Sequence, residues 1–274
     1  MADLFRSPIW HDPRVKPAFG AAQINWGHAL AGPRLTGYWL FHMGGLRNLA
    51  GRSGLATQSD SVWGPSPLGS MLVHDNTSDT TTLASDSSLL LPTQEITIAL
   101  EYRKLDTVNR ASGAIGVSGD GASGPRCGVH LPYSDGVVYW DFGGQTENTT
   151  RESVSGLTVT GPHIWIFTSG PRGMEIWQDG ILRSSNTANP TRTSDSARSC
   201  QLGVHGGIGG DAAGYGWVYI NQRQLTLDQC RHLSLEPFAF LQPIIRRRYV
   251  VPEAAAGAEG GGPRTFFAAP VGFP

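Results

Sequence analysis

Residues 173–185, GMEIWQDGILRSS, contain the clearest grouping of side chains that could do chemistry. Glu175, Trp177 and Asp179 occupy alternate positions, so in a β-strand they share one face. Two carboxylates beside a tryptophan are groups that a sugar-cleaving site uses. Asp179-Gly180 is also a dipeptide that favours a two-residue hairpin turn, because both residues tolerate positive φ. We interpret the stretch as a hairpin and not as an active site.

Two loops offer oxygen ligands for a metal ion. HDNTSD carries Asp75, Asn76 and Asp79, and GGDAAG carries Asp211. Calcium takes roughly six to eight oxygen ligands, and neither loop has the acidic density of a dedicated site. Asp and Asn are frequent in turns for another reason, because their side chains hydrogen-bond the local backbone. We therefore predict no cofactor, with calcium at these loops left open but not indicated.

The overall composition argues against several classes of protein. A net charge of −1 and a pI near 6.7 lack the basic excess of a nucleic-acid-binding protein. Three separated cysteines, Cys127, Cys200 and Cys230, form no CxxC pair, which favours buried thiols over disulfides or a zinc cluster. No signal-peptide core and no run of 18 apolar residues is present, which predicts cytoplasmic synthesis without a membrane span.

Short β segments separated by Gly, Asp, Asn and Ser dominate the middle of the chain. They are rich in β-branched and aromatic residues, and several alternate with a period of two. Strands are predicted at 36–42, 93–104, 111–119, 126–132, 136–143, 152–160, 162–170, 174–178, 181–185, 199–206 and 214–221. About a dozen strands at this spacing are typical of a β-sandwich or jelly roll.

One helix is predicted over residues 225–237. Thr226 and Gln229 form a capping-box pattern at its start. Leu227, Cys230 and Leu233 make an apolar stripe, and Pro237 ends the helix.

Two flanking segments differ from this sandwich region. Residues 1–34 are interrupted by prolines and read as an extended N-terminal arm. Residues 236–274 combine the basic triplet 246–248 with an Ala/Gly-rich spacer and a Phe/Pro-rich end, which indicates a second arm. The predicted domains are therefore 1–34, 35–235 and 236–274.

The central region resembles the concanavalin A-like, or laminin-G-like, jelly-roll superfamily. The resemblance rests on the order of EITIALEYR, then GPHIWIFTSGPRGMEIWQDGILRSS, then CQLGVHGGIGGDAAGYGWVYINQRQLTLDQCRHL. It implies an all-β sandwich with one short helix near its C-terminal end. In the resembling hairpin Met174 and Ile176 point inward, which places Trp177 on the outer face.

Retaining hydrolases of this superfamily carry E-x-D-x-x-E or a close variant on one strand. The nearest match here runs from Glu95 to Glu101, with Thr97 in place of the Asp and the wrong spacing. Fold alone does not transmit function, so we predict that the protein is not an enzyme.

A narrower resemblance concerns LSLEPFAFLQPIIRRRYV, which is similar to the ending of such domains in tailed-bacteriophage and prophage proteins. Glu236 and Phe238 depart from the usual Asn and Trp. The resemblance implies a virion structural protein, such as a decoration, fibre or adhesin-like module, that forms homo-oligomers and contacts other virion proteins. Docking of the arms is predicted to involve Phe5, Trp10, Arg246, Arg247, Arg248, Phe266, Phe267 and Phe273.

The alternative function is a lectin-like module that binds host surface glycans. A glycan binder needs exposed aromatic side chains beside polar groups in a groove or at a rim. The predicted ligand-binding residues are Tyr133, Asp135, Tyr139, Trp177 and Asp211. The two functions are compatible, because a virion protein can also bind host sugars.

Overall fold

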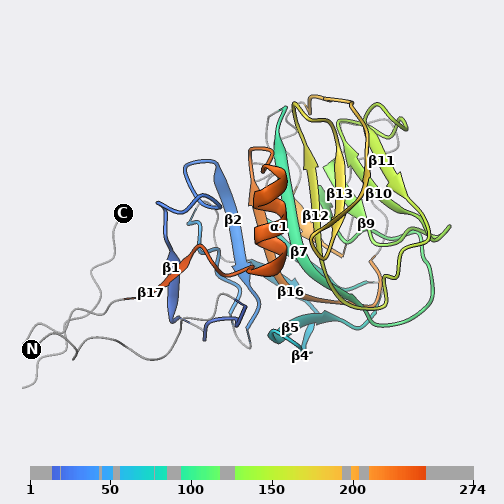
Figure 1. Cartoon of the computed structure of the whole chain (residues 1–274). Helices are drawn as coiled ribbons and strands as arrows, with labels where there is room; N and C mark the ends of the chain where they lie inside the picture. Colours follow the sequence, from blue (N-terminus) through green and yellow to red (C-terminus); the bar gives the residue numbers. More distant parts are fainter. Residues whose placement is uncertain are drawn as a thin grey trace, which may run out of the picture. The chain divides into compact units, whose positions relative to one another are not determined.

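The computed structural model describes residues 14–18, 20–42, 45–51, 56–76, 78–84, 94–117, 127–192, 199–203 and 210–244. These residues form two large antiparallel β-sheets, a two-stranded sheet and one α-helix (Figure 1). The predicted all-β sandwich with a single helix near its C-terminal end is confirmed. No helix in these ranges is long and apolar enough to cross a membrane.

The first sheet has eight strands. In spatial order they are β14 (Ile181–Ser185), β13 (Glu175–Gln178), β12 (Gly161–Ser169), β7 (Ile96–Lys104), β16 (Ala213–Asn221), β5 (Gly69–His74) and β4 (Val62–Ser66), with β2 (Leu35–Leu40) also paired to β16. Strand β16 pairs with β7 along one edge, and with β5 and then β2 along the other.

The second sheet has seven strands. In order they are β11 (Arg151–Val154), β10 (Val138–Phe142), β9 (Cys127–His130), β8 (Ile115–Val117), β15 (Cys200–Leu202), β6 (Thr80–Ala84) and β3 (Thr57–Ser59). A separate pair, β1 (Ala22–Ile24) and β17 (Leu241–Pro243), forms the small sheet.

The main hydrophobic core lies between the two large sheets. Alternate residues of each strand enter it, because side chains of a strand point to opposite faces. In β10 these are Val138, Trp140 and Phe142, which leaves Tyr139 and Asp141 on the other face of the seven-stranded sheet. Trp140 Nε1 also donates to Thr168 O at 2.9 Å, which joins the two sheets. The thiols of Cys127, Cys200 and Cys230 are buried, as predicted.

A second core covers the outer face of the eight-stranded sheet. Its sheet residues include Ala99, Ile166, Trp177, Trp217 and Tyr219. The helix, β1, β17 and the turns around them pack over these side chains (Figure 1). The segments predicted as arms thus contribute residues 22–31 and 238–241 to this layer.

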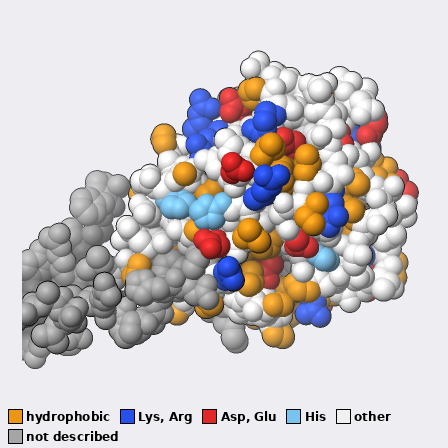
Figure 2. Space-filling model, viewed as in Figure 1, with side chains coloured by type: hydrophobic (Ala, Val, Ile, Leu, Met, Phe, Trp, Pro, Cys, Tyr) orange, Lys and Arg blue, Asp and Glu red, His pale blue; other side chains and the backbone are white. Residues whose placement is uncertain are grey.

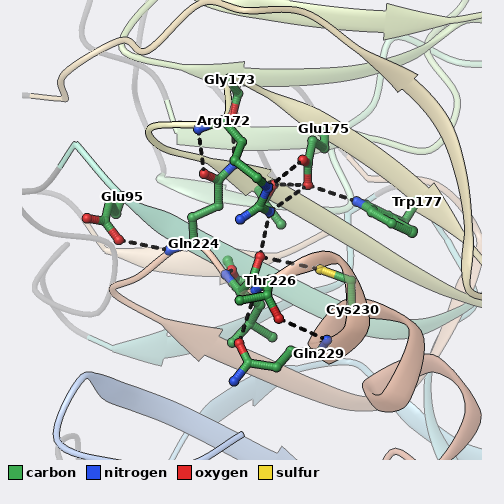
Figure 3. Close-up of polar contacts among 12 residues, drawn as sticks. Glu95, Arg172, Gly173, Glu175, Trp177, Gln224, Thr226, Gln229 and Cys230 are labelled. Atoms are coloured by element: carbon green, nitrogen blue, oxygen red, sulfur yellow. Dashed lines mark hydrogen bonds and ion pairs between the residues drawn. The ribbon is translucent and has the colours of Figure 1, made fainter. Parts of the chain in front are cut away.

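The helix, α1 (Leu227–Leu235), begins with the predicted capping box. Thr226 Oγ1 accepts from Gln229 N at 3.2 Å, and Gln229 Oε1 accepts from Thr226 N at 3.0 Å (Figure 3). Cys230 and Leu233 are buried against the sheet, whereas Leu227 is 40% exposed, contrary to the predicted stripe. The apolar face of α1 is therefore narrow.

A buried lysine, Lys16, anchors the segment that precedes β1. Lys16 Nζ donates to Ser70 O at 2.5 Å and to Gly216 O at 2.7 Å, close to the buried carboxylate of Glu101. Burial lowers the pKa of Lys16 to about 8, although the charge of Glu101 opposes this shift. Burial also raises the pKa of Glu101. Gly216 leaves room for this pair, because a Cβ there would lie 1.7 Å from Glu101 Oε2.

We predict that Gly216→Ala lowers the free energy of unfolding by about 2–3 kcal/mol, because the added methyl group must displace a buried carboxylate. Chemical denaturation of the purified protein measures the change. Gly27→Ala is the matched control, since a Cβ there meets only Asn25 Oδ1, at 3.4 Å. A Gly216→Ala protein as stable as the control would contradict the packing described.

Candidate functional site

The carboxylates of the 173–185 hairpin are structural. Glu175 is buried and accepts hydrogen bonds from Thr168 Oγ1 at 2.9 Å and from Arg172 Nε and Trp177 Nε1 at 3.1 Å. Arg172 Nη2 also donates to Leu225 O at 2.6 Å, in the turn before α1 (Figure 3). The carboxylate therefore links β12 and β13 to the start of the helix.

Asp179 lies in the hairpin turn, as predicted, with φ values of 52° for Asp179 and 78° for Gly180. Its carboxylate accepts from Ile164 N at 2.9 Å and contacts His163 Nδ1 at 2.7 Å. Both contacts tie the turn back to β12, so Asp179 stabilises the hairpin.

The prediction of Trp177 as a ligand-binding residue is wrong. Its side chain is on the outer face, as expected, but only 1% of it is exposed, because the second core covers that face. Alternation along a strand gives the face of a residue, and it does not reveal what packs on that face.

The prediction of Asp211 as a ligand-binding residue is also wrong. The residue is 2% exposed, and its Oδ2 lies 2.8 Å from both Lys104 Nζ and Ser112 Oγ. Arg110 Nη1 adds a weaker contact at 3.5 Å. A carboxylate paired in this way holds the neighbouring loops together.

The other three predicted ligand-binding residues lie together at one rim of the sandwich. Tyr133 and Asp135 belong to the turn between β9 and β10, and Tyr139 follows on β10. Tyr139 Oη donates to Asp135 Oδ2 at 2.7 Å, and the two tyrosine rings are 6.1 Å apart at 78°. Tyr133 and Tyr139 are partly buried, and Asp135 is exposed. No hydrogen bond is made to the Tyr133 hydroxyl by the residues described.

Strand register adds His130 and Arg151 to this group and supplies a buried partner for Arg151, Asp141, and the sequence revealed none of these contacts. His130 pairs with Tyr139 across β9 and β10, and Asp141 pairs with Arg151 across β10 and β11. The Arg151 guanidinium donates two hydrogen bonds to Asp141, at 2.5 and 2.7 Å, and its Cζ lies 4.3 Å from the Tyr139 ring centre. We call His130, Tyr133, Asp135, Tyr139 and Arg151 the tyrosine site.

Hydrogen bonds and ring contacts hold members of the tyrosine site in place. His130 Nδ1 contacts Ser112 O, and Ser112 Oγ donates to Asp211, so the site continues into the buried ion pair with Lys104. His130 is also packed edge-on against Tyr133, with ring centres 5.1 Å apart. A ligand would meet a surface that is already ordered.

The charges of the site keep Asp135 ionised and Tyr139 protonated. Burial and the hydrogen bond to Asp135 raise the pKa of Tyr139 to about 12. Burial opposes ionisation of Asp135, but hydrogen bonds from Tyr139 and from Val137 N outweigh it and lower the pKa of that carboxyl. The site thus presents a carboxylate acceptor and aromatic surface, groups that bind sugar hydroxyls and ring faces.

The turn that carries Asp135 also touches the loop after β7. Gly136 has a φ of 82°, and a Cβ there would lie 3.1 Å from Asn109 Nδ2. Asn109 and Val108 are exposed beside it. The loop therefore extends the same rim with an amide and an apolar side chain.

The remaining predicted sites are the loop around Asp79 and the docking residues of the two arms. Asp79 Oδ2 accepts from the backbone N–H groups of Asp75 and Asn76, which is turn chemistry. Among the residues described, no group of three His, Cys, Asp or Glu side chains is placed to hold a metal ion. The predicted docking residues lie outside the described ranges: Phe5, Trp10, Arg246, Arg247, Arg248, Phe266, Phe267 and Phe273.

The face that carries α1 is a mixed surface. Exposed apolar side chains there include Leu227 and Leu235 of the helix. Figure 2 shows apolar groups on this face interspersed with charges of both signs. Scattered apolar residues of this kind are normal on protein surfaces, so the tyrosine site is the stronger candidate.

No protein-family model matches the sequence, and no curated protein matches it. Similar folds are found among solved structures. Domain 4 of an extracellular arabinanase from Geobacillus stearothermophilus, in complex with arabinotriose, aligns with a TM-score of 0.60 and 15% identity. The alignment covers 73% of this chain and 98% of that domain.

Two further similar structures are larger. Trypanosoma rangeli sialidase with sialic acid aligns with a TM-score of 0.53 and 14% identity, over 78% of this chain and 35% of the sialidase. A structure of botulinum neurotoxin type C, whose cell entry depends on two ganglioside molecules, aligns with a TM-score of 0.54 and 12% identity, over 74% and 51%. This chain therefore spans about a third of the sialidase chain and half of the toxin chain. At such identities the similarity shows a shared β-sandwich fold.

We predict that Asp141→Asn lowers the free energy of unfolding by about 3 kcal/mol, because it leaves the Arg151 guanidinium without its buried counter-ion. Asp135→Asn is the matched control, an identical change at an exposed position, and it should cost less than about 1 kcal/mol. Urea unfolding of the two variants gives the comparison. Equal losses would mean that the Arg151–Asp141 pair does not hold the site.

Proposed function

We propose that this protein is a non-enzymatic, lectin-like β-sandwich that binds glycans at the tyrosine site. The observation that carries the proposal is the grouping of two partly exposed tyrosines with an ionised Asp135 on a braced rim. Aromatic rings pack against the C–H faces of sugars, and carboxylates accept hydrogen bonds from sugar hydroxyls. The Tyr133 hydroxyl, unpaired among the described residues, is a further group for a ligand.

The similar structures are in keeping with this proposal. The arabinanase domain was solved with arabinotriose, and the neurotoxin structure concerns ganglioside molecules. Function resides in sites and not in folds, so these likenesses add only to the geometry described above.

The absence of enzymatic activity is proposed from the state of the carboxylates. Hydrolysis of a glycosidic bond needs two carboxyl groups that converge on it. Asp141 is bound by Arg151, Glu101 is buried beside Lys16 and Ser66, and Glu175 is buried and bonded to Trp177. None of these three is free to meet a sugar. The two exposed carboxylates of the rim, Asp135 and Glu147, each accept a hydrogen bond from a hydroxyl, of Tyr139 and of Ser153 respectively.

We predict that Tyr133→Ala weakens glycan binding by about tenfold or more, because it removes the stacking surface and the free hydroxyl together. Glycan-array screening of the full-length protein followed by isothermal titration calorimetry measures the effect. Trp26→Ala is the control, since Trp26 is 49% exposed on a segment that covers the opposite sheet. Unchanged affinity in Tyr133→Ala, or no binding to any glycan by the parent protein, would refute the proposal.

A virion structural role is a second proposal, which rests on the resemblance of residues 233–250 to the ending of such domains in phage proteins. Within that stretch Phe238, Phe240 and Leu241 pack in the second core, and Ile244 N donates to Ala21 O at 3.0 Å, so the last described residues are fixed on the sandwich.

Light scattering of the full-length protein tests this second proposal. We predict an oligomer that dissociates at least partly when Phe266, Phe267 and Phe273 are replaced by Ala, because extended arms gain apolar burial on a neighbour. The Trp26→Ala variant serves again as the control. A full-length protein that is monomeric at all concentrations would count against self-assembly through the arms.

A further inference from the structure

Two exposed carboxylates, Asp135 and Glu147, lie near Tyr139. Asp135 accepts from its hydroxyl at 2.7 Å. On β11, Ser153 pairs with Tyr139, and Ser153 Oγ donates to Glu147 Oε1 at 2.6 Å. Glu147 also acts on Tyr139 electrostatically, raising the tyrosine pKa as a lesser cause after burial and Asp135. A ligand that covers Tyr139 must therefore come close to both negative charges.

The two arginines at and beside the tyrosine site, Arg151 and Arg110, already have carboxylate partners. Arg151 donates two hydrogen bonds to Asp141, and its remaining surface lies over the Tyr139 ring. Arg110, in the neighbouring loop, is ion-paired with Asp106 at 2.7 Å and with Asp211 at 3.5 Å. Neither guanidinium presents the open fork that binds the carboxylate or sulfate of a ligand.

The balance of charge at the surface is therefore negative. The buried carboxylate of Asp141 neutralises Arg151, so the exposed carboxylates of Asp135 and Glu147 contribute two negative charges, with His130 left out of the count. Carboxylates accept the hydrogen bonds that neutral hydroxyls donate, and they repel a ligand that carries its own anionic group.

We infer that the tyrosine site takes neutral glycans and selects against sialylated or sulfated ones. The inference rests on the proposed glycan-binding function and names its ligand class. Each of the two exposed carboxylates is expected to lower the affinity for an anionic ligand by about threefold, and the two together by roughly tenfold.

Isothermal titration calorimetry of the full-length protein tests the inference with matched probes. N-acetyllactosamine and its 3′-sialyl derivative differ by one anionic residue, and arabinotriose is a second neutral probe. We expect the neutral member of the pair to bind roughly tenfold more tightly at about 50 mM salt, and the difference to shrink at about 500 mM, because salt screens repulsion.

Glu147→Gln removes one charge without changing the shape of the side chain. It should reduce the preference for the neutral probe by about threefold. Asp228→Asn is the control, because Asp228 is an exposed carboxylate on α1 whose side chain is 94% accessible. The preference should be unaffected by that change.

The possible outcomes distinguish the inferred preference for neutral glycans from the proposed glycan binding itself. Equal or tighter binding of the sialylated probe, or weakening of that binding by added salt, overturns the inference and leaves glycan binding standing. If none of the three probes binds, and no neutral glycan on an array binds, the inferred preference for neutral glycans is overturned. This holds whether or not acidic glycans on the array bind. Failure of every glycan of either kind overturns the proposed function as well.

Discussion

The fold depends on the burial of both faces of its central strand pair, β7 and β16. Every residue of β16 is buried, as is nearly every residue of β7. One face of the pair meets the seven-stranded sheet in the main core, and the other carries Ala99, Trp217 and Tyr219 into the second core. Apolar surface of this extent is costly in water, so a second layer must cover it.

That requirement decides which parts of the molecule remain free for binding. The covering layer of α1, β1, β17 and the adjoining turns occupies the outer face of the eight-stranded sheet. Trp177 lies beneath that layer and donates to the buried carboxylate of Glu175, which Arg172 connects to Leu225 before the helix. The opposite sheet has no comparable apolar outer face on β10, where Tyr139 and Asp141 point away from the core. The candidate site follows from this asymmetry.

Local sequence signals predicted local structure well. The Asp179-Gly180 turn and the Thr226 capping box depend on neighbouring residues only, and both are present. Strands β1, β3 to β6 and β17 are not predicted from the sequence. Strands β1, β3 and β17 are only three residues long, and Thr80–Ala84 is mostly polar. Val62–Ser66 contains Gly64 and Pro65, and Gly69–His74 has a single run of three apolar residues. The sheet order, and with it the pairing of these segments, is a property of the whole chain.

The candidate site could be predicted only in part for the same reason. Tyr133, Asp135 and Tyr139 are close in sequence, so one turn brings them together. Arg151 reaches Tyr139 through the pairing of two strands, and Asp211 is buried by an ion pair with Lys104, more than 100 positions earlier. Neither contact leaves a trace in spacing or composition.

The pairing of β1 with β17 has a mechanical consequence. Ala21 is bonded to Ile244 and Asn25 to Phe240, on either side of this pair, whereas Lys16, nearer the N-terminus, is bonded to Ser70 in β5 and Gly216 in β16. A tension applied between the two ends of the described chain would therefore meet the hydrogen bonds of one buried lysine at the N-terminal end and strand β17 at the C-terminal end. The resistance of the N-terminal end would depend on a single side chain that grips the eight-stranded sheet directly.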